Sequence, residues 1–82
     1  MTVTATREEV ERTVFDSLVE FGAERELLTL DATLEELDID SLDLVELAQI
    51  AEDRFGVTFN AEDAQDVRTV RDALEMIVSR MQ

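Results

Sequence analysis

Three amphipathic stretches, each long enough for a helix, most strongly constrain how this 82-residue chain can fold. Apolar residues recur in them at steps of three and four, the spacing that lines one face of an α-helix. Proline is absent and the only glycines are Gly22 and Gly56, so few residues interrupt this period. The pattern predicts an all-α fold, a small four-helix bundle with three long helices, one short helix and a long first loop. We expect residues 1–82 to form a single domain, with residues 1–5 as a frayed tail.

Helix-capping pairs set the expected boundaries, because a polar side chain before the first turn and an acid three residues later satisfy free backbone N–H groups. The pairs are Thr6 and Glu9, Asp40 and Asp43, Asn60 and Asp63, and Thr69 and Asp72. The first helix should end at Gly22, and the second should cover about residues 41–55 and stop before Gly56. The short third helix should cover residues 61–65, and the last should run from residue 70 to residue 81.

The segment over residues 23–40 shows no long helical period. An irregular loop of this length is uncommon in a compact domain unless it carries function or packs through its own side chains. We expect its leucines to tuck it against the helices. They are Leu27, Leu28, Leu30, Leu34 and Leu37.

The composition excludes several kinds of catalytic site. Cysteine and histidine are absent, which removes disulfides, thiolate metal ligands, a cysteine nucleophile and the usual general base. A Ser-His-Asp arrangement cannot form within such a chain. Apolar residues make up 45% of the sequence, which is enough for one core.

The formal net charge of −14 predicts partners with basic docking surfaces. From Arg25 to Arg54 no basic residue intervenes while acids recur, so the negative charge is concentrated there. Such a charge opposes binding to nucleic acid or anionic membranes and favours a free monomer. No apolar run approaches the length of a membrane span and the N-terminus lacks a signal-peptide apolar region, so we expect a cytoplasmic protein without membrane insertion.

Ser41 is the candidate site of modification. With Asp40 as the cap, it falls in the first turn of the second helix, where backbone N–H groups lack intrahelical partners and the helix dipole is positive. A phosphate ester on its hydroxyl would gain about 0.3–1 kcal/mol from that dipole at a surface site. From the residues alone, Ser41 fits both an attachment point and an ordinary serine at a helix start.

The sequence around Ser41 resembles that of the acyl carrier proteins. The segment DSLD over residues 40–43, followed by LVEL over residues 44–47, is similar to that family's attachment motif and the start of its second helix. Further similarities are LEEL at residues 34–37, EDRF at residues 52–55 and the Thr-Val pair at residues 69–70. The resemblance covers nearly the whole chain, in order and with compatible spacing.

The resemblance implies that Ser41 bears 4′-phosphopantetheine, transferred from coenzyme A by a separate phosphopantetheinyl transferase, with Asp40 needed for recognition by that enzyme. The thiol of the arm then carries acyl groups as thioesters, and the protein is a carrier and not an enzyme. Its implied partners are acyltransferases, ketosynthases and related enzymes of fatty acid or polyketide biosynthesis, with the acyl tail sheltered between helices. The implied partner-binding residues are Leu42, Asp43, Val45, Glu46 and Glu52.

Three positions depart from the pattern common in this family. Asp38 stands where glycine is common, two places before the motif's aspartate, and Asn60 stands where proline is common. Gln49 stands where fatty-acid carriers often expose an apolar residue. The extended motif favours the fatty-acid type, while these departures fit a specialised paralogue, so the pathway stays open between fatty acid and polyketide biosynthesis. The acid before Ser41, with no Gly-Gly pair preceding it, favours an acyl carrier over a peptidyl or aminoacyl carrier.

Other interpretations of the acidic residues fit less well. Asp38, Asp40 and Asp43 are spaced closely enough to suggest a calcium loop, but Leu42 and Gln49 stand where that loop needs acids, and the required glycine is missing, so we expect no metal site. No pair of carboxylates is singled out for hydrolysis. The remaining alternative is a small acidic helical adaptor that binds a basic partner without being modified.

Overall fold

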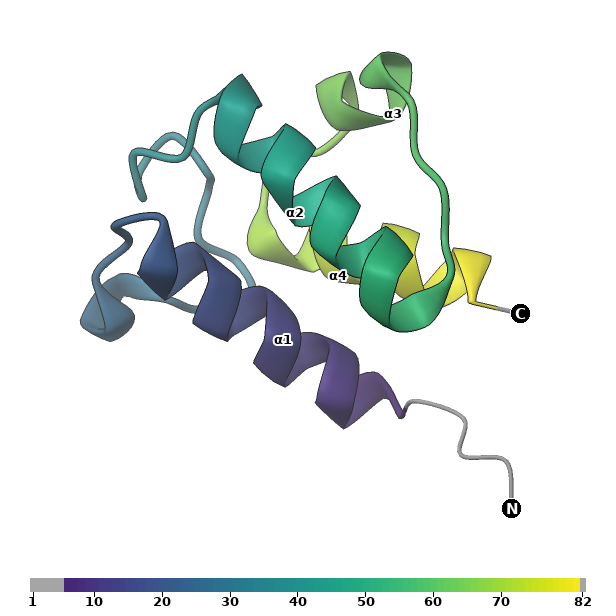
Figure 1. Cartoon of the computed structure of the whole chain (residues 1–82). Helices are drawn as coiled ribbons and strands as arrows, with labels where there is room; N and C mark the ends of the chain where they lie inside the picture. Colours follow the sequence, from purple (N-terminus) through teal and green to yellow (C-terminus); the bar gives the residue numbers. More distant parts are fainter. Residues whose placement is uncertain (1–5, 82) are drawn as a thin grey trace.

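The computed structural model describes residues 6–81, and the predicted tail over residues 1–5 lies outside this range. The elements are α1 (Arg7–Glu20), the 3₁₀ turn η1 (Arg25–Leu27), α2 (Ser41–Phe55), α3 (Ala61–Gln65) and α4 (Val70–Arg80). Helix α1 packs against α4 and α2, and the short α3 packs against α2 (Figure 1). Three long helices, one short helix and a long first loop confirm the predicted all-α bundle.

Reciprocal capping boxes start α2, α3 and α4, as predicted. In each, the capping side chain accepts from the backbone N–H three residues on, and the acid at that position accepts from the N–H of the cap. At α1 the Thr6 hydroxyl accepts from the Glu9 N–H at 3.2 Å. The predicted limits of α2 and α3 are confirmed to the residue, and α4 ends one residue earlier than expected, at Arg80.

Gly22 ends α1 through a Schellman motif. Phe21 is the C-cap, and Gly22 follows it at a φ of 115°. The Ala23 N–H donates to the Leu18 carbonyl and the Gly22 N–H donates to the Val19 carbonyl, both at 3.0 Å. These two bonds satisfy carbonyls that the last helical turn leaves free, and the positive φ is the reason that glycine suits this position.

The segment just before Ser41 contains a single helical turn that ends in the same hydrogen-bond motif as α1. The Thr33 hydroxyl accepts from the Glu36 N–H at 3.1 Å, which caps a single helical turn over residues 34–37. The Ile39 N–H then donates to the Leu34 carbonyl at 2.9 Å, and the Asp38 N–H donates to the Glu35 carbonyl at 3.1 Å. Asp38 adopts a φ of 58°, so an aspartate fills the left-handed position of this motif.

The long loop is fastened to the start of α4. The Leu34 N–H donates to the Arg68 carbonyl at 2.9 Å, and the Val70 N–H donates to the Ala32 carbonyl at 3.0 Å, which pairs Thr33 with Thr69 in an isolated antiparallel bridge. Arg71 adds a second link, because its guanidinium lies 3.0 Å from the Asp31 carboxylate. The loop that leads into α2 is therefore held on the body of the protein.

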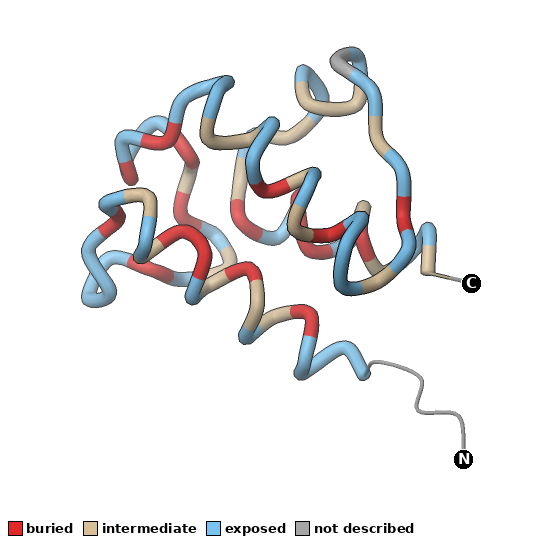
Figure 2. Tube along the Cα trace, viewed as in Figure 1, coloured by how far each residue is buried: buried red, intermediate tan, exposed pale blue. Residues whose placement is uncertain are grey.

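Buried apolar residues of the long helices, the loop and the α2–α3 connector belong to one hydrophobic core. Figure 2 marks the buried positions along the chain in red. Those with almost no exposed surface are Val10, Val14, Leu18, Val57, Val70 and Leu74. Of the loop leucines, Leu28, Leu34 and Leu37 are buried and Leu30 is half-buried, as expected. The expectation for Leu27 is wrong, since it is 51% exposed. Adjacent residues of a helical turn point in different directions, so turning Leu28 inward turns Leu27 outward.

No helix within residues 6–81 is both long enough and apolar enough to cross a membrane.

Candidate functional site

Ser41 is the first residue of α2 and is exposed to solvent. Its neighbour Asp40 is the N-cap: the Asp40 Oδ1 accepts from the Asp43 N–H at 3.0 Å, and the Asp43 Oδ2 accepts from the Asp40 N–H at 3.3 Å. This reciprocal box fixes the first turn, and Asp40 is itself exposed beside the serine. The Ser41 hydroxyl therefore stands at the positive end of a helix, on open surface.

The other two serines of the chain lack this combination. Ser17 is 5% exposed, within α1. Ser79 is exposed but lies in the last turn of α4, where its hydroxyl donates to the Met76 carbonyl at 2.9 Å. A helix end of that kind is the negative end of the dipole and disfavours an anionic ester. Ser41 is thus the serine best placed to carry a phosphate-linked group.

The outward face of α2 combines apolar and acidic side chains next to Ser41. Leu42 is 74% exposed and Val45 is 50% exposed, and both are large apolar residues at a spacing of three on one helical face. The structure places both of these implied partner-binding residues on the surface. Glu46 and Glu52 are exposed on the same helix, and Asp43 is half-buried in the capping box.

A cavity of about 330 Å³ lies between α2, α3, α4 and the connector that precedes α3. Leu44 and Val45 line it, and they follow Ser41 by three and four residues, which is about one helical turn. Its other apolar walls include Leu47, Ala48, Phe59, Val67, Met76 and Ile77. A chain attached at Ser41 would therefore find an apolar hollow within one turn of its anchor.

Polar side chains also line this cavity. Gln49 and Glu52 come from α2, and Asn60 and Asp63 come from the start of α3. Of these side chains, the Gln49 and Asn60 amides can donate hydrogen bonds to carbonyl oxygens of a chain, whereas the carboxylates of Glu52 and Asp63 can only accept. The cavity is thus suited to a chain that has both apolar and polar parts.

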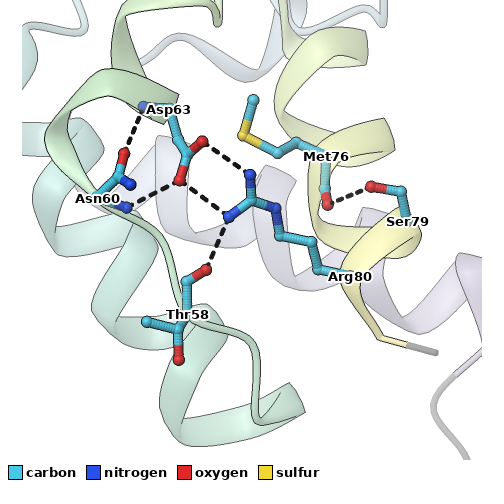
Figure 3. A network of polar contacts seen from close by, with 6 residues as sticks. All are labelled: Thr58, Asn60, Asp63, Met76, Ser79 and Arg80. Carbon is cyan, nitrogen blue, oxygen red and sulfur yellow. Dashed lines mark hydrogen bonds and ion pairs between the residues drawn. The ribbon is translucent and has the colours of Figure 1, made fainter.

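Arg80, at the end of α4, joins α3 and the connector before it (Figure 3). Its guanidinium donates to both carboxylate oxygens of Asp63, at 2.7 and 2.9 Å, and to the Thr58 carbonyl at 2.9 Å. It also lies 5.0 Å from the centroid of the Phe59 ring, within the range of a cation–π contact. The hydrogen bond from Arg80, followed by that from the Asn60 N–H, lowers the pKa of Asp63 below its usual value.

The acids on either side of Ser41 act as helix-capping residues. Within the described range, 6–81, no group of three or more acidic side chains is arranged to hold a metal ion. Asp40 and Asp43 instead direct carboxylate oxygens at each other's backbone N–H groups.

The polar lining of the cavity and the contacts of Arg80 were not predicted from the sequence. The pairing of Asn60 with Asp63 was visible as a capping signal, because its two members lie three residues apart. The contact between Asp63 and Arg80 spans 17 residues and leaves no local signal. Nothing in the spacing of the arginines distinguishes Arg80 from the others.

Comparison with known proteins gives a consistent family. The profile of the family described as "Phosphopantetheine attachment site" matches residues 12–77, which include Ser41. The solved acyl carrier protein of Thermotoga maritima has 24% identity and a TM-score of 0.73, over 92% of this chain and 89% of that chain, and supports the fold.

Two solved forms of the actinorhodin acyl carrier protein of Streptomyces coelicolor are also similar. The 3,7-dioxo-octyl form has 31% identity and a TM-score of 0.72, over 93% of this chain and 90% of that chain. The acetyl form has 30% identity and a TM-score of 0.70, over 99% of this chain and 95% of that chain.

Proposed function

Since this chain belongs to the phosphopantetheine attachment-site family, and within it to the acyl carrier proteins, we propose that Ser41 is the residue that carries the cofactor. The cofactor of the family is 4′-phosphopantetheine, and acyl carrier proteins are carriers and not enzymes. The observation that carries the proposal is the position of Ser41, which among the serines alone is both exposed and at the start of a helix.

Attachment requires that a transferase can reach the Ser41 hydroxyl and that the start of α2 can accommodate the resulting phosphodiester. In the transfer from coenzyme A, the Ser41 Oγ forms a bond to the phosphorus of the pantetheine phosphate, and the phosphoanhydride bond breaks. Adenosine 3′,5′-bisphosphate leaves, and the hydroxyl proton passes to a base of the transferase. The resulting phosphodiester is anionic, and the start of α2 favours an anion there. When bound, the arm supplies the thiol that holds acyl groups as thioesters.

The outward face of α2 is the proposed recognition surface for the transferase and for later enzymes. Leu42 and Val45 offer apolar contacts, and Glu46 offers a negative charge. Asp40 and Glu52 extend the charge on either side of this patch. A partner with a basic rim around an apolar depression would match both properties. We expect ketosynthases, acyltransferases and the transferase to present such surfaces.

We also propose that the acyl chains are intermediates of polyketide biosynthesis. Similar solved structures with about 30% identity include forms of the actinorhodin acyl carrier protein, two of which carry 3,7-dioxo-octyl and acetyl groups. In this chain, Gln49 and Asn60 bring amide groups to the cavity wall, where they can donate hydrogen bonds to ketone oxygens. A saturated chain would make no use of these groups.

Intact-mass measurement tests the attachment. The unmodified protein is incubated with coenzyme A and a phosphopantetheinyl transferase of broad specificity. We expect a gain of one phosphopantetheine in the wild type and in Ser79→Ala, and no gain in Ser41→Ala. No gain in the wild type would favour the unmodified acidic adaptor, and a gain in Ser41→Ala would place the attachment elsewhere.

Mass spectrometry of the protein isolated from its host tests the pathway. Thioesters with keto groups at alternate carbons are expected if the carrier serves polyketide biosynthesis. A population of fully saturated chains alone would assign the protein to fatty acid biosynthesis and refute the proposed pathway.

A further inference from the structure

Arg80 links the end of α4 to the short helix that forms one wall of the cavity (Figure 3). Its side chain joins Asp63 on α3 and the Thr58 carbonyl on the connector before α3. Within residues 6–81, no other ion pair joins α3 to α4. Among the described residues, Arg80 is therefore the one ionic link between this wall and α4.

Helix α3 has little stability of its own. It contains five residues, well below the length at which an isolated helix persists in water. Asp63, Ala64 and Val67, from α3 and the residues just after it, all line the cavity. If α3 shifts, the cavity loses this wall.

The pair is partly shielded from water, which strengthens it. The Asp63 side chain is 15% exposed and that of Arg80 is 39% exposed. Two parallel N–H···O bonds between a guanidinium and a carboxylate form a directional contact that fixes orientation as well as distance. The stacking on Phe59 holds the arginine from a second side, and Phe59 itself lines the cavity.

We propose that Arg80 is a positioning residue for the acyl chain, holding α3 as a fixed wall and so setting how much of the time the chain is sheltered in the cavity. This inference rests on the proposed function of the chain as a carrier with its arm on Ser41. The physical reason is preorganisation: a wall that is already in place costs less to order when the chain binds. Without the pair, α3 samples open positions, and the sheltered state is populated less.

The first test uses the unmodified protein, so it does not depend on the arm. Hydrogen–deuterium exchange is measured at the backbone amides of α3 and α1 in the wild type, Arg80→Gln and Arg71→Gln. We expect Arg80→Gln to speed exchange in α3 by about five-fold and to leave α1 unchanged. Arg71→Gln is the matched control, because it breaks another exposed pair on α4, with Asp31, away from the cavity.

The second test measures sheltering directly. Ser41 is loaded from octanoyl or acetyl coenzyme A, and the rate at which hydroxylamine cleaves the thioester is followed by intact mass. We expect Arg80→Gln to raise cleavage of the octanoyl thioester by about two- to five-fold and to leave the acetyl thioester unchanged. The acetyl group has little apolar surface to bury in the cavity, so it reports any change in general access. Arg80→Lys should be intermediate, because lysine keeps the charge but not the two parallel bonds.

Coupling to Asp63 completes the test. Asp63→Asn should raise octanoyl cleavage as Arg80→Gln does, and the double variant should add little to either single change. Equal octanoyl cleavage in the wild type and Arg80→Gln, both fully loaded, would overturn the role of Arg80 and leave the carrier function intact. Failure of Ser41 to load at all would instead refute the proposed function.

Discussion

Asp38 occupies, in the turn over residues 34–37, the same left-handed position that Gly22 occupies at the end of α1. In both motifs the residue at this position donates its N–H back to a carbonyl of the preceding turn, and the next residue donates to a carbonyl five residues earlier. Glycine adopts this conformation without steric cost, whereas any residue with a Cβ is strained there. The strain at Asp38 lies three residues before Ser41.

Replacing Asp38 should therefore stabilise the protein if the replacement is glycine. We expect Asp38→Gly to raise the free energy of unfolding by about 0.5–1 kcal/mol, because it relieves the strain at positive φ. Urea denaturation followed by circular dichroism measures the change. Asp38→Ala is the control, because it removes the same charge but keeps a Cβ. If the alanine variant is as stable as the glycine variant, loss of charge and not relief of strain explains the effect.

The negative charge of the whole chain should make stability depend on salt. At a net charge of −14, the carboxylates repel one another in the folded state, and added ions screen this repulsion. We expect the melting temperature to rise as sodium chloride is increased from low concentration, and to rise further with magnesium at equal ionic strength. A melting temperature that does not move with ionic strength would contradict this account.

The outward face of α2 should affect the rate at which partners bind. We expect Glu46→Arg to slow association with a phosphopantetheinyl transferase by about three- to ten-fold at low salt, and less at high salt, because it reverses a charge in the steering field. Stopped-flow or surface-based kinetics measures the association rate. Glu20→Arg makes the same charge change on an exposed residue at the end of α1 and should have a smaller effect. An equal loss at both salt concentrations would argue against steering.

The Arg7–Glu75 pair should make part of the stability depend on pH. The hydrogen bond from Arg7 lowers the pKa of Glu75 in the folded chain below its usual value. Around that pKa, the folded state therefore binds fewer protons than the unfolded state. The stabilisation from the pair is present above the pKa that Glu75 has in the unfolded chain, and it is lost as the pH falls through the pKa that Glu75 has in the folded chain. We expect the coupling between Arg7→Gln and Glu75→Gln, from a double-mutant cycle in urea, to be measurable at neutral pH and to vanish at strongly acidic pH. A coupling that persists in acid would exclude this pair as its source.

The features that the sequence predicted well are those with short-range causes. The limits of α2 follow from the Asp40–Asp43 capping box and from Gly56, and all of these signals lie within or beside the helix. The limits of α3 follow in the same way from Asn60 and Asp63. The exposure of Ser41 agrees with its place in the first turn, and its role as the attachment residue stays a prediction.

The features that the sequence did not predict depend on contacts between distant segments. The pairing of Thr33 with Thr69 and the ion pair between Asp63 and Arg80 join residues that no periodic pattern relates. The exposure of Leu27 was missed for a related reason, because composition cannot say which of two adjacent leucines a tight turn directs inward. The left-handed conformation of Asp38 was not predicted, because glycine indicates a positive φ and aspartate does not.

Asp63 accepts hydrogen bonds both from the cap of α3 and from Arg80, and these two contacts together affect how the cavity opens. Its Oδ2 accepts both from the Asn60 N–H, which completes the cap of α3, and from Arg80. If α3 moves and the Asp63 carboxylate loses its bond to Arg80, it also loses its capping bond to the Asn60 N–H. A five-residue helix without its cap is not stable. On the proposed role of Arg80, we therefore expect release of a sheltered chain to occur by local melting of α3, at a rate that rises steeply with temperature, and not by the swing of a rigid flap.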